Sequence, residues 1–331
     1  MVEAIGLIQI NFIQGEKIMK IKSLIIKQNE TIRRNKTLIK DLELYLMVIP
    51  GLLLLIVFKY IPLYGIIMAF NDYNPGVGIL SSKWVGLLHF IQFFNDPYCY
   101  RILKNTVVLG VLTLAFTFPA PIIFALMLNE VKNTVFKKIT QTISYMPYFL
   151  SIVIVVGMMA DFTSYSEGIV NSIIQSLGGD RINFFGSPEW FRPLYIISAI
   201  WQGIGFSSII YLAAIAGINI EMYEAAIIDG AGRLKQIFYV TLPSIMPTIT
   251  ILFILAIGGI MGNDFQKIFL MYNPSTYSTA DVVSTYVYRA GILGASYSYS
   301  TAIGLFLSII SFLFLYSANK ISKKVSDIYL W

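Results

Sequence analysis

The sequence predicts an all-α integral membrane protein with six transmembrane helices. Of its 331 residues, 56% are hydrophobic and 13% are charged, and the mean hydropathy is +0.71. A soluble domain carries about 25% charged residues, so this composition is typical of a chain that lies mostly in lipid. Six apolar runs, each long enough to cross a hydrocarbon core of about 30 Å, alternate with polar segments.

Residues 1–40 form a basic segment ahead of the first apolar run. The positive-inside rule therefore predicts that this N-terminal segment is cytoplasmic and that residues 41–331 form the transmembrane domain. The apolar patch at residues 4–13 is too short to span and precedes the charges, which is unlike a secretory signal. Met19 followed by Lys20 is an alternative start, which would make residues 1–18 an upstream extension; the mass of the natively expressed chain tests this hypothesis.

The six spans are expected at residues 44–70, 106–128, 139–160, 194–218, 245–269 and 299–318. Lys59 and Pro62 interrupt the first span, and Pro119 and Pro121 predict a kink in the second. Most Lys and Arg residues precede the first span or follow the second, fourth and sixth. Both termini are therefore expected in the cytoplasm of a multi-pass protein of the cytoplasmic membrane.

The sequence lacks the residues and motifs that several classes of function require. Cys99 and His89 are the single Cys and the single His, so neither a disulfide framework nor a Cys/His zinc cluster can form, and no metal site is expected. The formal charge of +6 follows the predicted topology and needs no nucleic-acid partner. The chain has no G-x-x-x-x-G-K-[ST], HExxH or GxSxG sequence, so we expect no catalytic residues and no ATPase site of its own.

The polar segment at residues 219–243 lies between the fourth and fifth predicted spans. Asn219 is a suitable helix N-cap, and Glu221 and Glu224 place negative charge in the first turns, where the helix dipole favours it. Gly230 and Gly232 can end this helix in conformations that other residues resist. The sequence therefore predicts a short helix and a sharp turn at the membrane face.

A second short helix is expected from Arg233 towards Leu242, with Pro243 opening the fifth span. The spacing across the whole segment resembles the EAA signature of permease subunits in binding-protein-dependent ABC importers: Glu-Ala-Ala, three residues, Gly, nine residues, Ile, one residue, Leu-Pro. The matching positions are Glu224, Ala225, Ala226, Gly230, Val240 in place of Ile, Leu242 and Pro243, and Asp229 and Ala231 fit the extended form of the signature.

The resemblance implies a fold like that of a type I ABC importer permease, in which this segment is a cytoplasmic coupling helix held in a cleft of an ATPase. Glu224 is then expected to anchor the helix electrostatically and Gly230 to permit the turn. Softer similarities to the polysaccharide-type subgroup of these permeases occur at residues 60–65, 84–87, 284–289 and 330–331. That subgroup is associated with the import of oligosaccharides such as aldouronates, alginate fragments and complex glycans.

The resemblance also implies a set of partner proteins. ATP with Mg²⁺ would be bound by two cytoplasmic ATPase subunits, and this chain would carry no cofactor. A second homologous permease, expected to be a different chain, would complete the membrane unit, and an external solute-binding protein would deliver the oligosaccharide.

Candidate residues for a sugar pathway are aromatic side chains that can stack on pyranose rings and polar groups that can bond their hydroxyls. They are Tyr145, Tyr148 and Phe149 on the third span, Trp201, Gln202 and Phe206 on the fourth, and Asn263, Asp264 and Lys267 near the outer end of the fifth. Tyr145 and Phe149 are expected on one helix face, as are Asn263 and Lys267. In the alternative interpretation the aromatic residues form interfacial belts, and Asp264 pairs with Lys267.

A second class of function is an ion-coupled secondary carrier, which needs ionisable groups or broken helices near the membrane midplane. The pair Asp264 and Lys267 is the one cluster that resembles such a site, and it lies near an outer end. A membrane-embedded enzyme is a third class, which the missing motifs disfavour. Co-purification with an ATPase discriminates between the first two.

Overall fold

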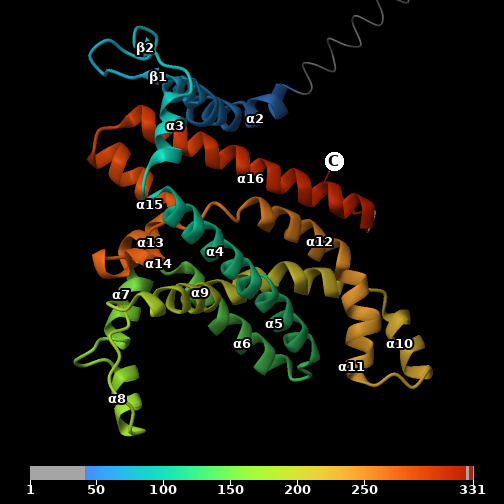
Figure 1. The fold of residues 1–331 in the computed structure, drawn as a ribbon. Coiled ribbons are helices and arrows are strands. Elements are labelled where there is room, and N and C mark those ends of the chain that lie inside the picture. Colours follow the sequence, from blue (N-terminus) through green and yellow to red (C-terminus); the bar gives the residue numbers. More distant parts are fainter. Residues whose placement is uncertain (1–41, 326–327, 331) are drawn as a thin grey trace, which may run out of the picture. The chain divides into compact units, whose positions relative to one another are not determined.

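The computed structural model describes residues 42–325 and 328–330 (Figure 1). The basic segment and the alternative start at Met19 lie outside the described residues. The chain divides into two units, residues 1–65 and 66–331, which we describe separately. In the first unit, α2 (Leu42–Leu55) continues through a π-helical turn (Ile56–Tyr60) into a 3-10 helix (Ile61–Phe70) that runs on into the second unit.

The second unit begins with a short antiparallel pair, β1 (Asn71–Asp72) and β2 (Lys83–Trp84). Its first α-helices are α3 (Leu88–Asn95), α4 (Cys99–Thr117), α5 (Pro119–Glu130), α6 (Thr134–Tyr145), α7 (Ile152–Phe162), α8 (Ile169–Ser176) and α9 (Pro188–Ala216). There follow α10 (Ile220–Ile228), α11 (Arg233–Gln236), α12 (Leu242–Gly258), α13 (Phe265–Met271), α14 (Tyr277–Ala280), α15 (Val283–Tyr288) and α16 (Tyr297–Val325).

Within the described residues, five helical stretches are long and apolar enough to cross a membrane. They are Leu44–Phe70, Cys99–Glu130, Pro188–Ala216, Arg233–Gly258 and Tyr297–Lys324. A sixth candidate consists of two segments, Thr134–Phe149 and Ile152–Phe162, that meet at an angle of 102°. The predicted class, an all-α membrane protein with six candidate spans, agrees with this architecture.

The third span consists of two helical segments that meet at an angle, which corrects the expectation of a single span over residues 139–160. Pro147 lies in a 3-10 turn (Met146–Phe149) that follows α6, and Ser151 caps the N-terminus of α7 by accepting the backbone N–H of Ile154 at 3.4 Å. The side-chain amide of Gln202 donates to the carbonyl oxygen of Leu150 at 3.1 Å, which satisfies a backbone group that the break leaves free. Tyr145 and Phe149 therefore do not share a face of one α-helix.

The fifth span also differs from its expected limits. The helix predicted from Arg233 towards Leu242 is the first part of the span, because α11, a π-helical turn (Ile237–Thr241) and α12 form one continuous stretch. The π-helical turn directly before Pro243 shifts the hydrogen-bond pattern by one residue, so the missing proline N–H does not end the helix. At the other end, α12 stops at Gly258, and Lys267 lies on the separate helix α13.

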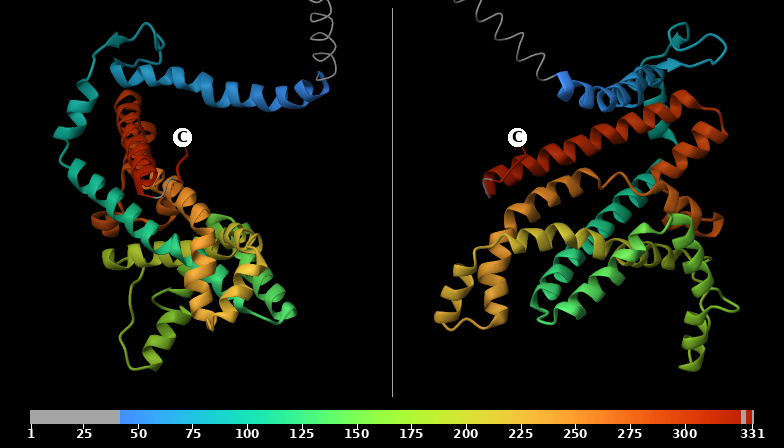
Figure 2. Two further views of the ribbon diagram at one scale, coloured as in Figure 1. Left: turned by 90° about the vertical axis from the view of Figure 1, so that its right-hand side faces the viewer. Right: turned by 180° about the vertical axis from the view of Figure 1, so that it is seen from behind.

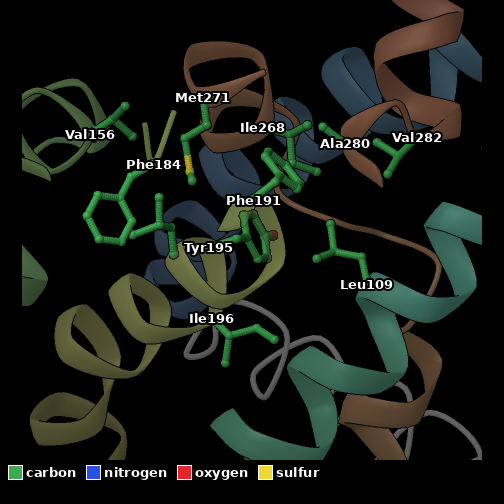
Figure 3. Close-up of a cluster of buried hydrophobic side chains, with 11 residues drawn as sticks. Leu109, Val156, Phe184, Phe191, Tyr195, Ile196, Ile268, Met271, Ala280 and Val282 are labelled. Atoms are coloured by element: carbon green, nitrogen blue, oxygen red, sulfur yellow. The ribbon is translucent and has the colours of Figure 1, made fainter. Parts of the chain in front are cut away.

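A buried cluster joins the central helices near one end of the second unit (Figure 3). Leu109 of α4, Phe191 and Tyr195 of α9 and Ile268 and Met271 of α13 contribute to it. A second cluster, around Ile122, Tyr211 and Ile245, joins α5, α9 and α12. Helix α9 contributes to both clusters and is the central helix of the unit.

The connecting segments of the second unit lie at two opposite ends. The α5–α6 turn, the α10–α11 hairpin and the C-terminal end of α16 lie at one end, whereas β1, β2, α8 and α13–α15 lie at the other (Figures 1 and 2). We call these the hairpin end and the strand end.

Candidate functional site

The hairpin formed by α10 and α11 is built on a well-capped helix. The side chain of Asn219 accepts the backbone N–H of Glu221 at 3.1 Å, and its amide donates to the Glu221 carboxylate at 3.2 Å. Asn219 thus acts as the predicted N-cap, and the acidic side chain of Glu221 lies in the first turn, where it complements the helix dipole.

The turn of the hairpin depends on Gly230. Its φ is +74°, in the left-handed region, and the backbone N–H of Ala231 reaches back to the carbonyl of Ala226 at 2.8 Å. This is the hydrogen bond of a Schellman C-cap, for which glycine is the favoured residue. Gly232, by contrast, has a φ of −68°, which any residue adopts, and neither glycine has another atom within 4 Å of the position that a Cβ would occupy.

Two polar contacts stabilise the hairpin, one between α10 and the π-helical turn that follows α11, the other between α11 and the turn of the hairpin. The hydroxyl of Tyr223 lies 2.9 Å from the hydroxyl of Thr241, which is buried, and the side-chain amide of Gln236 donates to the Ala231 carbonyl at 2.8 Å. Thr241 is the last residue of the π-helical turn within the fifth span, so this contact joins α10 to the span directly before α12.

The structure places the signature residues from Glu224 to Ala231 on α10 and the turn of this hairpin, whereas Val240, Leu242 and Pro243 lie beyond α11, in the π-helical turn and the start of α12. Exposed members are Glu224, Ala225, Asp229, Gly230 and Pro243, and half-buried members are Ala226, Ala231 and Leu242. Around them the apolar side chains of Ile228 (85% exposed) and Leu234 (72%) are open to contact. The hairpin therefore offers acidic and apolar groups together at the hairpin end.

Three of the aromatic pathway candidates meet in one stack. The rings of Tyr148 and Phe206 lie parallel with centroids 4.0 Å apart, and Phe149 meets both rings edge-on. Tyr148 and Phe206 line a cavity of about 600 Å³ between α4, α5, α9 and α12, together with Thr117 and Ser207. The cavity thus combines an aromatic face with hydroxyl groups.

A smaller polar cavity of about 160 Å³ adjoins it and shares the lining residues Leu114, Thr117 and Ala256. Asn263 and Asp264 line this second cavity. Asn263 donates to the Thr106 carbonyl at 3.1 Å, whereas the Asp264 carboxylate accepts the backbone N–H of Lys267 at 3.1 Å and caps α13.

Lys267 forms no ion pair with Asp264 in the described part of the chain, which disagrees with the alternative interpretation that these two residues pair. Its side chain is only 2% exposed, and its ammonium lies 5.0 Å from the ring centroid of Tyr195, a residue that sequence analysis missed. Burial lowers the pKa of Lys267 to about 8, against a smaller opposing effect of Asp264. Asn263 precedes α13 and shares no helix face with Lys267.

The remaining pathway candidates lie apart from these two cavities. Trp201 lines a separate, almost wholly apolar cavity of about 600 Å³ between α7, α8 and α9. Gln202 is occupied by the Leu150 carbonyl, and Tyr145 is the last residue of α6, outside the aromatic stack.

A buried ionic cluster lies at the strand end, and the sequence analysis did not predict it because its residues form no recognisable motif. The Asp281 carboxylate is fully buried and accepts hydrogen bonds from Arg289 at 2.8 Å, Arg101 at 3.3 Å and the Thr285 hydroxyl at 3.0 Å. Asn105 donates to the Asp281 carbonyl at 3.1 Å. The cluster therefore ties α4 to the α14–α15 segment. Its only sequence signal is a set of charges in a mostly apolar chain.

These features define a polytopic helical membrane protein whose central helices line a mainly apolar cavity and a small polar one, and whose hairpin is exposed at one end. Within the described residues, no group of three or more His, Cys, Asp or Glu side chains could hold a metal ion. The chain belongs to the family described as "Binding-protein-dependent transport system inner membrane component", which matches residues 102–327. It is thus a permease of the ABC importer class.

Curated relatives match along nearly the whole chain. The polygalacturonan/rhamnogalacturonan transport system permease protein YteP of Bacillus subtilis (strain 168) is 44% identical over 307 residues, which cover 93% of this chain and 96% of the relative. Protein LplB of the same organism is 45% identical over 285 residues, covering 86% and 90%.

Among solved structures, a chain from the crystal structure of a bacterial alginate ABC transporter, in complex with an alginate pentasaccharide-bound periplasmic protein, has the same fold. The TM-score is 0.82 at 43% sequence identity, and the match covers 89% of this chain and 99% of that chain.

Proposed function

We propose that this chain is one of two transmembrane permease subunits in an ATP-driven importer that moves an oligosaccharide across the cytoplasmic membrane. Two cytoplasmic ATPase subunits bind ATP and Mg²⁺, a second permease of different sequence completes the pathway, and an external binding protein delivers the sugar. The chain itself catalyses no reaction. Its termini and the α10–α11 hairpin lie in the cytoplasm.

The observation that carries this proposal is the geometry of the hairpin. Glu224, Ala225 and Ala226 lie on a capped helix with an exposed acidic and apolar surface, and the Tyr223–Thr241 contact joins that helix to the fifth span directly before α12. Movement of a protein bound to Glu224 and its surroundings can therefore be transmitted to α12 through a single contact. This arrangement suits mechanical coupling better than it suits ion-driven transport.

The choice of an oligosaccharide as substrate rests on the relatives and on the cavities. Relatives named as permeases for polygalacturonan/rhamnogalacturonan and for arabinooligosaccharides favour a sugar chain. The stacked Tyr148 and Phe206, with Thr117 nearby, offer a ring face and hydroxyl partners of the kind that pyranose units need. Asn263 and Asp264 extend this pathway towards the strand end.

The proposal is tested by isolating the chain from its native membrane and identifying the proteins that remain bound. We expect a second permease and an ATPase, and we expect vesicles containing the complex to take up oligosaccharide only while ATP is hydrolysed. Uptake that a proton ionophore abolishes while ATP stays high would instead identify a secondary carrier.

The pathway is tested separately with Tyr148→Ala and Phe206→Ala. Both variants should slow uptake while ATP still binds, because they remove the ring face from the cavity. Trp201→Ala serves as a comparison, since Trp201 lines the separate apolar cavity. Equal uptake by wild type and both pathway variants would place the sugar route elsewhere.

A further inference from the structure

A polar cavity at the strand end lies outside both the hairpin and the pathway described above. It has a volume of about 480 Å³, within the usual range for small-molecule sites. It is formed where β1 and α3 meet the first turn of α16, and its lining residues include Asp72, Tyr73, Gln92, Asp96 and Tyr297. All of these lie in the second unit.

Part of the lining is fixed by hydrogen bonds within the protein. Buried His89 is held between the Asn71 carbonyl and the Gln92 side chain, at 3.1 Å from each. The Asp96 carboxylate accepts the hydroxyl groups of Tyr286 and Tyr299 and, at 2.8 Å, the backbone N–H of Tyr98. These contacts hold the cavity wall in place without using its remaining polar groups.

Other groups in the lining are unoccupied. Among the described residues, the carboxylate of Asp72 and the hydroxyls of Tyr73 and Tyr297 have no hydrogen-bond or ion-pair partner. The Gln92 amide nitrogen is likewise free to donate within the described part of the chain, since the His89 contact uses its oxygen. The cavity therefore offers acceptors and donors together, which is what a ligand rich in hydroxyl groups requires.

Aromatic rings accompany these polar groups. The rings of Tyr73 and Tyr297 meet edge-on with centroids 6.1 Å apart, and the Tyr73 backbone N–H donates to Ser298 at 2.9 Å, so the two walls are connected. Tyr297 is 37% exposed. Its neighbour Ala295, which also lines the cavity, is the one non-glycine residue with positive φ (+52°) in the described ranges.

The charge of the lining selects among sugars. Asp72 and Asp96 are both acidic, and among the described residues no Lys or Arg lines the cavity. Lys83 lies opposite Asp72 in the strand pair, but no ion pair joins them in the described structure. Such a site repels the carboxylate of a uronic acid and accepts hydroxyl donors of a neutral sugar.

We propose that this cavity is an outer subsite that binds a neutral pyranose unit of the oligosaccharide before it passes into the membrane. The proposal rests on the proposed function, because it assumes that the strand end faces outwards and that the cargo is a sugar. It adds a binding site remote from the membrane pathway and a preference for uncharged over acidic rings.

The test measures sugar binding to the assembled importer in lipid nanodiscs, without nucleotide or binding protein, by saturation-transfer NMR. The probes are the neutral disaccharides galactobiose and mannobiose and their acidic counterparts digalacturonate and dimannuronate, which differ only at C6. We expect both neutral sugars to bind and the acidic ones to bind at least about tenfold more weakly, which corresponds to one unfavourable charged contact.

Three variants locate the binding. Asp72→Asn and Tyr297→Phe each remove one unoccupied polar group, and each should weaken neutral-sugar binding about tenfold, with Asp72→Asn also narrowing the gap to the acidic sugars. Glu189→Gln, an exposed carboxylate outside the cavity, is the matched control and should bind as wild type does.

Unchanged binding in both cavity variants, or failure of both neutral sugars to bind, overturns the inference. Weaker docking of the binding protein in those variants, with sugar binding unaltered, also overturns it and makes the cavity a protein contact. ATP-driven uptake is measured in parallel. If uptake fails while the cavity variants still alter sugar binding, the proposed function is wrong and the cavity remains a sugar-binding site without a role in import.

Discussion

The Asp281 carboxylate is the single side chain on which the contact between α4 and α15 depends most. It is fully buried, and two guanidinium groups and one hydroxyl satisfy its oxygens. Arg289 also lies over the rings of Tyr277 and Tyr286, with 4.9 and 5.8 Å between its guanidinium carbon and the ring centroids. Removing the negative charge leaves two cations with no compensating partner in this cluster.

We predict that Asp281→Asn lowers the free energy of unfolding by about 3–5 kcal/mol, as breaking a buried ion pair does. The thermal midpoint of the purified protein in detergent measures this. Asp180→Asn removes an exposed carboxylate at the same end and should change stability by no more than about 0.5 kcal/mol. Equal losses in the two variants would contradict the assigned role of Asp281.

Sequence analysis identified the hairpin residues but not this cluster, for a physical reason. Asn219 and Gly230 act within one short segment, so the cap and the turn were predictable from local sequence, and both are confirmed. Arg101 and Asp281 are 180 positions apart and meet only after α4 packs against the segment before α15. The residues next to Asp281 in the sequence do not indicate that its carboxylate is buried.

At the scale of elements, the approach of α6 to α9 depends on one glycine. A Cβ at Gly205 would lie 2.1 Å from the carbonyl oxygen of Ser144, whereas a Cβ at Gly203 would meet nothing closer than the Ser207 hydroxyl at 4.0 Å. Both glycines lie in α9, so comparing substitutions at the two positions distinguishes the effect of close helix packing from the effect of helix propensity.

We predict that Gly205→Ala destabilises the protein by about 1–3 kcal/mol, because the backbone of α6 must move away. Gly203→Ala should be neutral or stabilising by up to about 1 kcal/mol, since alanine favours the helix. Thermal unfolding in detergent compares them. Matching midpoints for the two variants would mean that α6 does not approach α9 as closely as described.

The number of apolar runs and their order were predictable from the sequence, but two of their shapes were not. A hydropathy profile predicts which segments lie in lipid, but it contains no information on the direction of the helix axis. The 102° bend after Phe149 therefore cannot be predicted from it. That break depends on the Ser151 cap and on Gln202, which comes from another helix. The start of the separate helix α13 likewise depends on the cap that Asp264 provides.

At the scale of the whole molecule, the proposed orientation places the hairpin end of the second unit in the cytoplasm and its strand end outside. The single cysteine makes this testable, because Cys99 is only 7% exposed and gives little background labelling. Lys132, in the α5–α6 turn, and Asp180, after α8, are both exposed and lie at opposite ends.

We predict that a membrane-impermeant maleimide labels Asp180→Cys in right-side-out vesicles and labels Lys132→Cys only after permeabilisation. The positive-inside distribution of Lys and Arg is the physical reason. Labelled fractions on a gel give the result, with the unsubstituted chain as control. The opposite pattern would invert the topology and place the hairpin outside.

The central claim is that the α10–α11 hairpin transmits the ATPase cycle to the membrane helices, and it is tested most directly by sugar uptake per ATP hydrolysed in proteoliposomes. Gly230→Ala forces alanine into a φ of +74°, at a cost of about 1–2 kcal/mol, whereas Gly232→Ala keeps an ordinary backbone conformation. We predict that Gly230→Ala lowers uptake per ATP at least about fivefold, the population change that this cost implies, and that Gly232→Ala retains the wild-type ratio. A wild-type ratio for Gly230→Ala would contradict the claim.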